Sequence, residues 1–237
     1  MKYFFSIFFS LSYICSYSQF SSGYGAPRIS TGNNMATMAN TDVFVTSRAV
    51  DVSAFDRITG SPFLSPEARK AFIKLTTGEK FSNVLVRFNV YNNEILLDNG
   101  KQFLALMNID SVAYNEILPS GNSQSVILKT GYPAINKNTA ASVYQVLTSK
   151  NNIQLLKYYK LKIEKVKTMG MPDKDAFITT ADYYLFNSAS KAMEQVKLNK
   201  KSVLNTLVII NGALENTQKL VGNFRSERDL INLINAL

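Results

Sequence analysis

The sequence contains no histidine, and its single cysteine is Cys15. Without histidine, the chain lacks the commonest general base, the commonest zinc ligand and the base of the Ser-His and Cys-His nucleophile systems. Walker A and GxGxxG motifs are also absent, so nothing supports nucleotide binding. We therefore predict no cofactor, no metal site and no catalytic residue.

The first 20 residues, MKYFFSIFFSLSYICSYSQF, follow the order of a secretory signal. Lys2 supplies the positive charge, and the apolar run after it is shorter than the about 20 residues that span a membrane. Small residues follow at Ser16 and Ser18. We predict a signal peptide over residues 1–18, cut between Ser18 and Gln19.

Cys15 lies before the predicted cut, and the large Ile14 that precedes it is unlike a lipoprotein signal. The mature chain is then expected to carry no cysteine and no disulfide, so that its stability comes from packing. It is also expected to contain no transmembrane helix. The predicted location is the periplasm, or the outer-membrane or extracellular face.

The chain carries 26 basic and 17 acidic residues, a net charge of +9. The lysines are spread along the sequence without a run of five, which is typical of a solvated surface. For an exported protein, nucleic acid is not the expected partner.

Alternating apolar residues dominate the middle of the chain and predict strands. Residues 19–60 are rich in Ser, Gly, Asn and Thr and are predicted to form an extended or disordered lead-in, with an edge strand within 42–50. A single domain is predicted over 61–237. The expected strands within it are 72–76, 82–91, 94–98, 101–107, 109–117, 124–131, a long hairpin over 141–167 with its tip at 150–152, and 176–188.

From about residue 190 to residue 237 the apolar spacing becomes helical. Gly212 and Gly222 are candidate helix ends. Ser226, with Asp229 three residues later, predicts a capping box for the last helix. The predicted fold class is α+β: an antiparallel meander or sheet, barrel-like or a sandwich, followed by two or three C-terminal helices.

The segment VLVRFNVYNNEILLDNGK (84–101) predicts two tight turns. Asn92-Asn93 and Asn99-Gly100 are good two-residue hairpin turns, because these residues tolerate positive φ. With these turns, Arg87 directly faces Asp98, and Asp98 faces Lys101. We interpret Arg87 and Asp98 as a pair that fixes the strand register, rather than as part of an active site.

Tyrosines lie near lysines in the last strands. Tyr158, Tyr159, Tyr183 and Tyr184 fit two interpretations: a platform for carbohydrate or peptide, or side chains that pack in the core and at its edge.

Five segments occur in an order that resembles a family of exported proteins of unknown function, common in Bacteroidota. They are GYGAPRI (23–29), GSPFL (60–64), VRFNVYNNEI (86–95), NKKSVLNTL (199–207) and FRSERDLINLI (224–234). The resemblance covers most of the chain after the signal. It implies an envelope location and a β-rich fold, and it brings no catalytic residues.

These observations predict a non-enzymatic binding or structural protein of the cell envelope, with an envelope protein or a glycan as its partner. Two alternatives stay open: a hydrolase that uses carboxylate, Ser or Lys residues, and an outer-membrane-associated protein. Ser188-Ala-Ser-Lys191 and Lys129-Thr-Gly131 match motifs of serine penicillin-binding proteins, but they occur in the reverse order.

Overall fold

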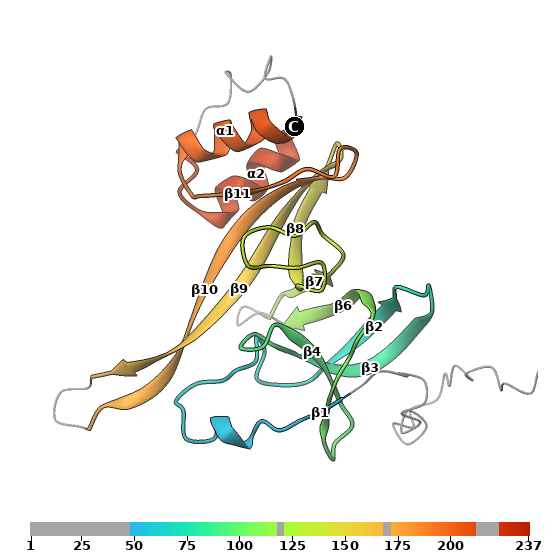
Figure 1. Ribbon diagram of the computed structural model, residues 1–237, viewed down its shortest axis with the longest axis vertical. Coiled ribbons are helices and arrows are strands. Elements are labelled where there is room, and N and C mark those ends of the chain that lie inside the picture. The colour runs from blue at the N-terminus through green and yellow to red at the C-terminus, as the bar shows by residue number, and fades with distance from the viewer. Residues whose placement is uncertain (1–47, 118–120, 168–171, 212–222) are drawn as a thin grey trace, which may run out of the picture.

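The described part of the protein forms one open antiparallel sheet of eleven strands, followed by two helices (Figure 1). The computed structural model describes residues 48–117, 121–167, 172–211 and 223–237. The sheet order is β1-β5-β4-β3-β2-β6-β7-β8-β9-β10-β11. The strands are β1 (Arg48–Val50), β2 (Arg69–Leu75), β3 (Lys80–Asn89), β4 (Glu94–Asp98), β5 (Phe103–Ala105), β6 (Ile109–Ile117), β7 (Ser123–Lys129), β8 (Tyr144–Lys150), β9 (Ile153–Val166), β10 (Lys174–Asn187) and β11 (Met193–Val196).

The α+β class and the C-terminal helices confirm the prediction from the sequence. The helices are α1 (Lys200–Asn211) and α2 (Glu227–Ala236), and neither is long and apolar enough to cross a membrane, within the ranges that the structure describes. Both lie over the end of the sheet formed by β8 to β11 (Figure 1). One expectation over 190–237 is wrong: residues 193–196 form strand β11, which pairs with β10.

Alternation places one side of each central strand in the core. In β3, Val84, Val86 and Phe88 are buried, whereas Leu85 and Arg87 between them are partly exposed. Cβ atoms alternate between the two faces of a sheet, so this pattern gives β3 one apolar face.

Strands β9 and β10 form an arm of 14 residues each that pairs along its whole length (Figure 1). The preceding turn between β8 and β9 consists of Asn151 and Asn152, both with positive φ (48° and 66°). This is the backbone that a two-residue hairpin turn requires, and it confirms the predicted hairpin tip.

Apolar side chains gather into three clusters. The first covers β2 to β7 on one face of the sheet, and the second packs α1 and α2 on the same face of β8 to β11. The third lies on the opposite face around Tyr132, Tyr144 and Tyr184. On the face that carries the first two clusters, the core is therefore formed by strand residues alone at β2 to β7 and by strands and helices together at β8 to β11.

The predicted lead-in over 19–60 is ordered in its described part, 48–60. Strand β1 pairs with β5 at the edge of the sheet, as expected for the edge strand within 42–50. Thr59 then pairs with the arm: its N–H donates to the carbonyl of Asp175 (2.9 Å), and the N–H of Phe177 donates to the carbonyl of Thr59 (3.0 Å).

The predicted register between β3 and β4 is wrong by two residues. Asn89 pairs with Glu94, so the loop has four residues instead of two, and Asn93, but not Asn92, has a positive φ (56°). The reason is that Val90 leaves the β3–β4 ladder, since its N–H donates to the carbonyl of Pro62 (2.8 Å).

The second turn differs from the prediction in the same way. Asp98 faces Phe103 instead of Lys101, and the loop spans residues 99–102. The side chain of Asn99 accepts hydrogen bonds from the N–H groups of Lys101 and Gln102 (3.0 and 2.8 Å), which stabilises the longer turn. Gly100 takes the left-handed conformation, with φ of 77°.

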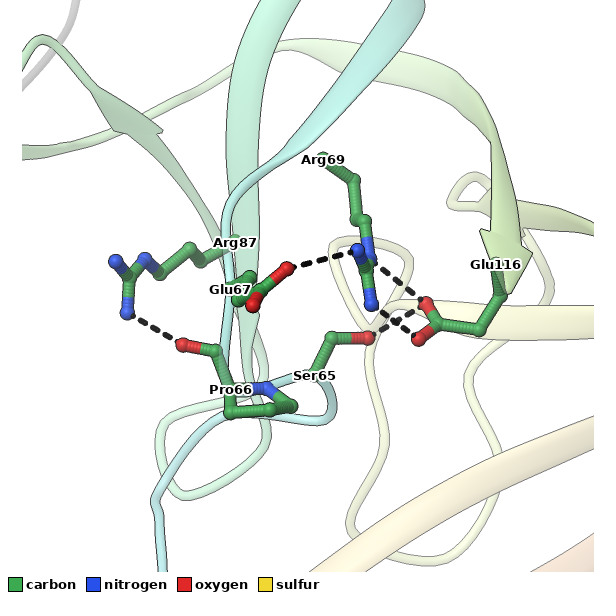
Figure 2. Close-up of polar contacts among 6 residues, drawn as sticks. All are labelled: Ser65, Pro66, Glu67, Arg69, Arg87 and Glu116. Atoms are coloured by element: carbon green, nitrogen blue, oxygen red, sulfur yellow. Dashed lines mark hydrogen bonds and ion pairs between the residues drawn. The ribbon is translucent and has the colours of Figure 1, made fainter. Parts of the chain in front are cut away.

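Arg87 therefore faces Leu96, but its side chain still reaches Asp98 diagonally. The Nε–Oδ2 distance is 3.1 Å, and both side chains are largely buried. The guanidinium also donates to the carbonyl of Pro66 (3.0 Å) (Figure 2). It lies 5.2 Å from the centre of the Phe63 ring. Arg87 thus holds the segment before β2 against β3 and β4.

We expect Arg87→Ala to lower the free energy of unfolding more than Asp98→Ala, because Arg87 also loses its contacts with Pro66 and Phe63. The double variant should lose less than the sum of the two, by about 0.2–1 kcal/mol, the energy of such a pair. Urea unfolding of the four proteins measures this coupling. Strict additivity would show that the ion pair contributes nothing.

Candidate functional site

A polar cavity of about 260 Å³ opens on the sheet face that carries the first two clusters. Strands β6 to β9, the segment before β2 and the first turn of α2 surround it. Ten residues line it: Leu64, Ser65, Tyr114, Glu116, Gln124, Val126, Gln145, Lys157, Tyr159 and Glu227.

The strand register explains why this cavity is polar. One row of paired residues crosses the sheet from β6 to β10: Val112, Leu128, Gln145, Lys157 and Tyr183. Val112 and Leu128 belong to the first apolar cluster, and Tyr183 packs against the second. Gln145 and Lys157 interrupt the row between the two clusters, where neither core covers the sheet.

Arg69, Glu116 and Ser65 form the first polar group of the cavity (Figure 2). Arg69 on β2 binds the carboxylate of Glu116 on β6 with two nitrogens, Nη2 to Oε1 at 2.7 Å and Nε to Oε2 at 3.2 Å. The hydroxyl of Ser65 donates to Oε2 of Glu116 (2.7 Å). Such a bidentate pair fixes both the distance and the orientation of the carboxylate.

Competing effects set the pKa of Glu116. Burial acts to raise it, but the hydrogen bonds from Arg69 and Ser65 and the charge of Arg69 outweigh burial and leave the pKa lowered. The hydrogen bond to Glu116 in turn raises the pKa of Arg69. Glu116 is therefore a carboxylate at neutral pH, and Arg69 balances its charge.

Lys157, Glu227 and Tyr183 form the second polar group. The Nζ of Lys157 lies 2.7 Å from Oε2 of Glu227, and the hydroxyl of Tyr183 donates to the same oxygen (2.9 Å). Burial, followed by the hydrogen bond to Glu227, raises the pKa of Tyr183 to about 12. This group ties the first turn of α2 to β9 and β10.

The start of α2 is fixed by its cap. The side chain of Ser226 accepts a hydrogen bond from the N–H of Asp229 (3.2 Å), and the carboxylate of Asp229 accepts from the N–H of Ser226 (3.0 Å). This is the capping box that the sequence predicts. It places Glu227 in the first helical turn, directly beside the cavity.

Gln145 and Tyr159 form the third polar group. The hydroxyl of Tyr159 donates to Oε1 of Gln145 (2.6 Å), and the Nζ of Lys157 lies 4.8 Å from the centre of the Tyr159 ring. Gln145 is only 6% exposed. Its amide nitrogen has no acceptor among the residues that the structure describes. The amide N–H₂ group of Gln145 thus lines the cavity as a donor with no protein acceptor.

The charged groups of the cavity are paired with each other, so they are less available as acids, bases or metal ligands. The two carboxylates each bind a cation, and the hydroxyl of Ser65 binds a carboxylate with a lowered pKa. Within the described parts of the chain, no three or more Asp, Glu, His or Cys side chains gather as metal ligands.

The motifs that resemble penicillin-binding proteins lie outside the cavity. Ser188 to Lys191 form the tight turn between β10 and β11, with Lys191 at a φ of 60°. Lys129 ends β7, and Gly131 follows it at a φ of 80°. The S-x-x-K segment therefore opens no helix, which is the context that its catalytic role requires.

The four tyrosines divide between the two faces of the sheet. Tyr159 and Tyr183 lie on the cavity side, where they bind Gln145 and Glu227. Tyr158 and Tyr184 lie on the opposite side, both in edge or tilted contact with the ring of Tyr144. Tyr159 packs against the first apolar cluster and Tyr183 against the second, so all four tyrosines pack on apolar side chains, and the ligand platform stays a prediction.

Of the residues singled out from the sequence, Tyr159 lines the cavity, and Ser226 lies next to the lining residue Glu227, whereas the turn residues and their pair do not line it. Those on the turns and their pair are Arg87, Asp98, Asn92, Asn93, Asn99 and Gly100. The predicted cleavage residues, Ser18 and Gln19, lie outside the described residues. A signal for the cavity was present in the sequence, because Gln145 and Lys157 are polar residues inside alternating apolar strands.

Comparison with known proteins found no family model, no curated protein and no solved structure that matches this chain.

Proposed function

We propose that this chain is an exported protein of the cell envelope that binds a small polar ligand in its cavity and does not catalyse a reaction. One observation carries the proposal: the amide N–H₂ group of Gln145 has no protein acceptor and lines a polar cavity between two apolar cores. This donor is open to the cavity, so a ligand can accept a hydrogen bond from it in place of water, a net gain of about 0.5–1.5 kcal/mol.

The paired charges support binding over catalysis. A hydroxyl nucleophile needs a nearby base whose pKa lies close to the working pH. Ser65 has a carboxylate neighbour, but the pKa of Glu116 is lowered, and Arg69 occupies both of its oxygens. Glu116 thus positions Ser65 without being able to accept its proton readily.

The predicted signal over 1–18 and the resemblance to an exported family support the envelope location. The partner is then a molecule of the envelope, as predicted from the sequence.

Purification from the envelope of cells that make the full chain tests the proposal. We expect the protein in the envelope fraction to begin at Gln19 and native mass spectrometry to show a bound small molecule. Gln124, an exposed residue at the cavity, offers a way to block it. Gln124→Trp should remove the bound molecule, because the indole ring fills the opening.

The matched control is Gln102→Trp, the same change on an exposed loop that does not line the cavity. This variant should keep the bound molecule. Retention of the molecule by Gln124→Trp would show that the cavity is not the site. Cleavage of an envelope polysaccharide or peptide by the wild type, lost in Ser65→Ala, would show that the protein is an enzyme.

A further inference from the structure

We infer that the cavity binds a neutral, hydroxyl-rich ring, that is, one unit of a saccharide. This inference rests on the proposed function and names its ligand class. Charge balance is the first argument. Arg69 with Glu116 and Lys157 with Glu227 leave no net charge at the cavity. A charged ligand would leave its own charge uncompensated in a partly buried site, which is costly.

The second argument is the mixture of donors and acceptors. Gln145 offers an N–H₂ donor without a protein acceptor, and the amide of Gln124 offers both a donor and an acceptor. Glu116 and Glu227 present carboxylate oxygens as acceptors. A hydroxyl group donates one hydrogen bond and accepts two. A ligand with several hydroxyls on one ring therefore satisfies both kinds of group at once, whereas an apolar ligand satisfies neither.

The third argument is the size and the apolar part of the wall. The volume of about 260 Å³ is below the roughly 300–1,000 Å³ of pockets for drug-sized ligands, which limits the ligand to about one ring. Leu64, Val126 and the rings of Tyr114 and Tyr159 provide apolar surface beside the polar groups. A sugar ring has C–H faces that fit such surface and hydroxyl edges that fit the polar groups.

The test is an NMR titration of the purified protein with five sugars. Glucose, galactose and N-acetylglucosamine are neutral, whereas glucosamine is cationic and glucuronic acid is anionic. We expect at least one neutral sugar to shift the amide signals of β6 to β9. It should bind at least about tenfold tighter than both charged sugars, the factor that about 1.4 kcal/mol provides.

Gln145→Glu isolates the amide donor. The carboxylate still accepts the hydrogen bond from Tyr159, so the fold is retained, but the N–H₂ donor is replaced by an acceptor. We expect binding to weaken at least about tenfold. Gln102→Glu makes the same charge change on the exposed loop and should leave binding unchanged.

The outcomes separate this inference from the proposed function. Preference for glucosamine or glucuronic acid, or unchanged binding by Gln145→Glu, overturns the inference. If none of the five sugars binds, the identity of the molecule that copurifies with the protein tests the inference. A neutral sugar supports the inference, whereas a charged or hydroxyl-free molecule overturns it and leaves the proposed function intact. A cavity that carries no molecule and binds no sugar overturns both.

Discussion

Raising the pH from 9 to 12 is expected to unfold this protein cooperatively, with its buried tyrosines releasing their protons only as the fold is lost. Burial raises the pKa of Tyr144 to about 12, and burial with the hydrogen bond to Glu227 does the same for Tyr183. Burial also raises the pKa of Tyr114, Tyr132 and Tyr159. The neutral phenol is therefore the form that the fold stabilises.

The direction of the effect follows from proton linkage. In the unfolded chain tyrosine ionises near pH 10, whereas the folded chain holds the proton to a higher pH. Stability from these groups is thus fully present below pH 10 and is lost between pH 10 and about 12. Each tyrosine that keeps its proton in the fold lowers the free energy of unfolding by about 1.4 kcal/mol per pH unit in this window. Several such groups together exhaust the 5–15 kcal/mol of a typical domain.

Absorbance at 295 nm follows tyrosinate, and far-UV circular dichroism follows the sheet. We expect both to change together between pH 10 and 12. Tyr144→Phe removes one buried hydroxyl, and its stability should fall less steeply above pH 10 by about 1.4 kcal/mol per pH unit. Ionisation of the tyrosines near pH 10 with an unchanged dichroism spectrum would contradict the burial of these phenols.

The sequence predicts the strands well, because apolar and polar residues alternate where one face of a strand is buried and the other is exposed. The strands predicted at 94–98 and 109–117 have the bounds of β4 and β6 in the structure. The tip of the β8–β9 hairpin is also predicted, since Asn151 and Asn152 both favour positive φ. The distant contacts of this turn, with Leu237 and Ser188, leave its two-residue loop unchanged. Local signals suffice where neighbours in sequence are also the partners in space.

Prediction fails where a distant residue sets the backbone. The turn at 90–93 is lengthened by the hydrogen bond from Val90 to Pro62, and Asn93 binds the backbone of Val143 on both sides of its amide (2.7 and 3.1 Å). Strand β11 has four residues, too few for alternation to stand out from helical spacing. The contacts of Val90 with Pro62 and of Asn93 with Val143 join residues far apart in sequence, so the local sequence does not indicate them.

The cavity was missed for a related reason. Its residues come from β6, β7, β8, β9, α2 and the segment before β2, so only the strand order brings them together. Gln145 and Lys157 are twelve residues apart in sequence and directly opposite in the sheet. A single polar residue in a strand predicts an exposed position. Only the cross-strand pairing shows that Gln145 and Lys157 together line a cavity.

Ile234→Ala is expected to lower the free energy of unfolding by about 2–5 kcal/mol, the range for deletion of a fully buried Ile or Leu side chain. Ile234 lies on α2, is 0% exposed, and belongs to the cluster that joins both helices to the sheet. Its removal leaves a cavity among Leu-rich neighbours that cannot collapse without moving α2. Urea unfolding followed by circular dichroism measures the loss.

The matched control is Ile209→Ala, the same change on α1 at a side chain that is 62% exposed, which should alter stability by less than about 0.5 kcal/mol. Equal effects at the two positions would contradict the packing of α2 on the sheet. The consequence reaches the cavity, because α2 carries Glu227 and its packing helps to keep that carboxylate beside Lys157 and Tyr183. Ile234→Ala should therefore also weaken ligand binding, although Ile234 does not line the cavity. Ile209→Ala should leave binding unchanged.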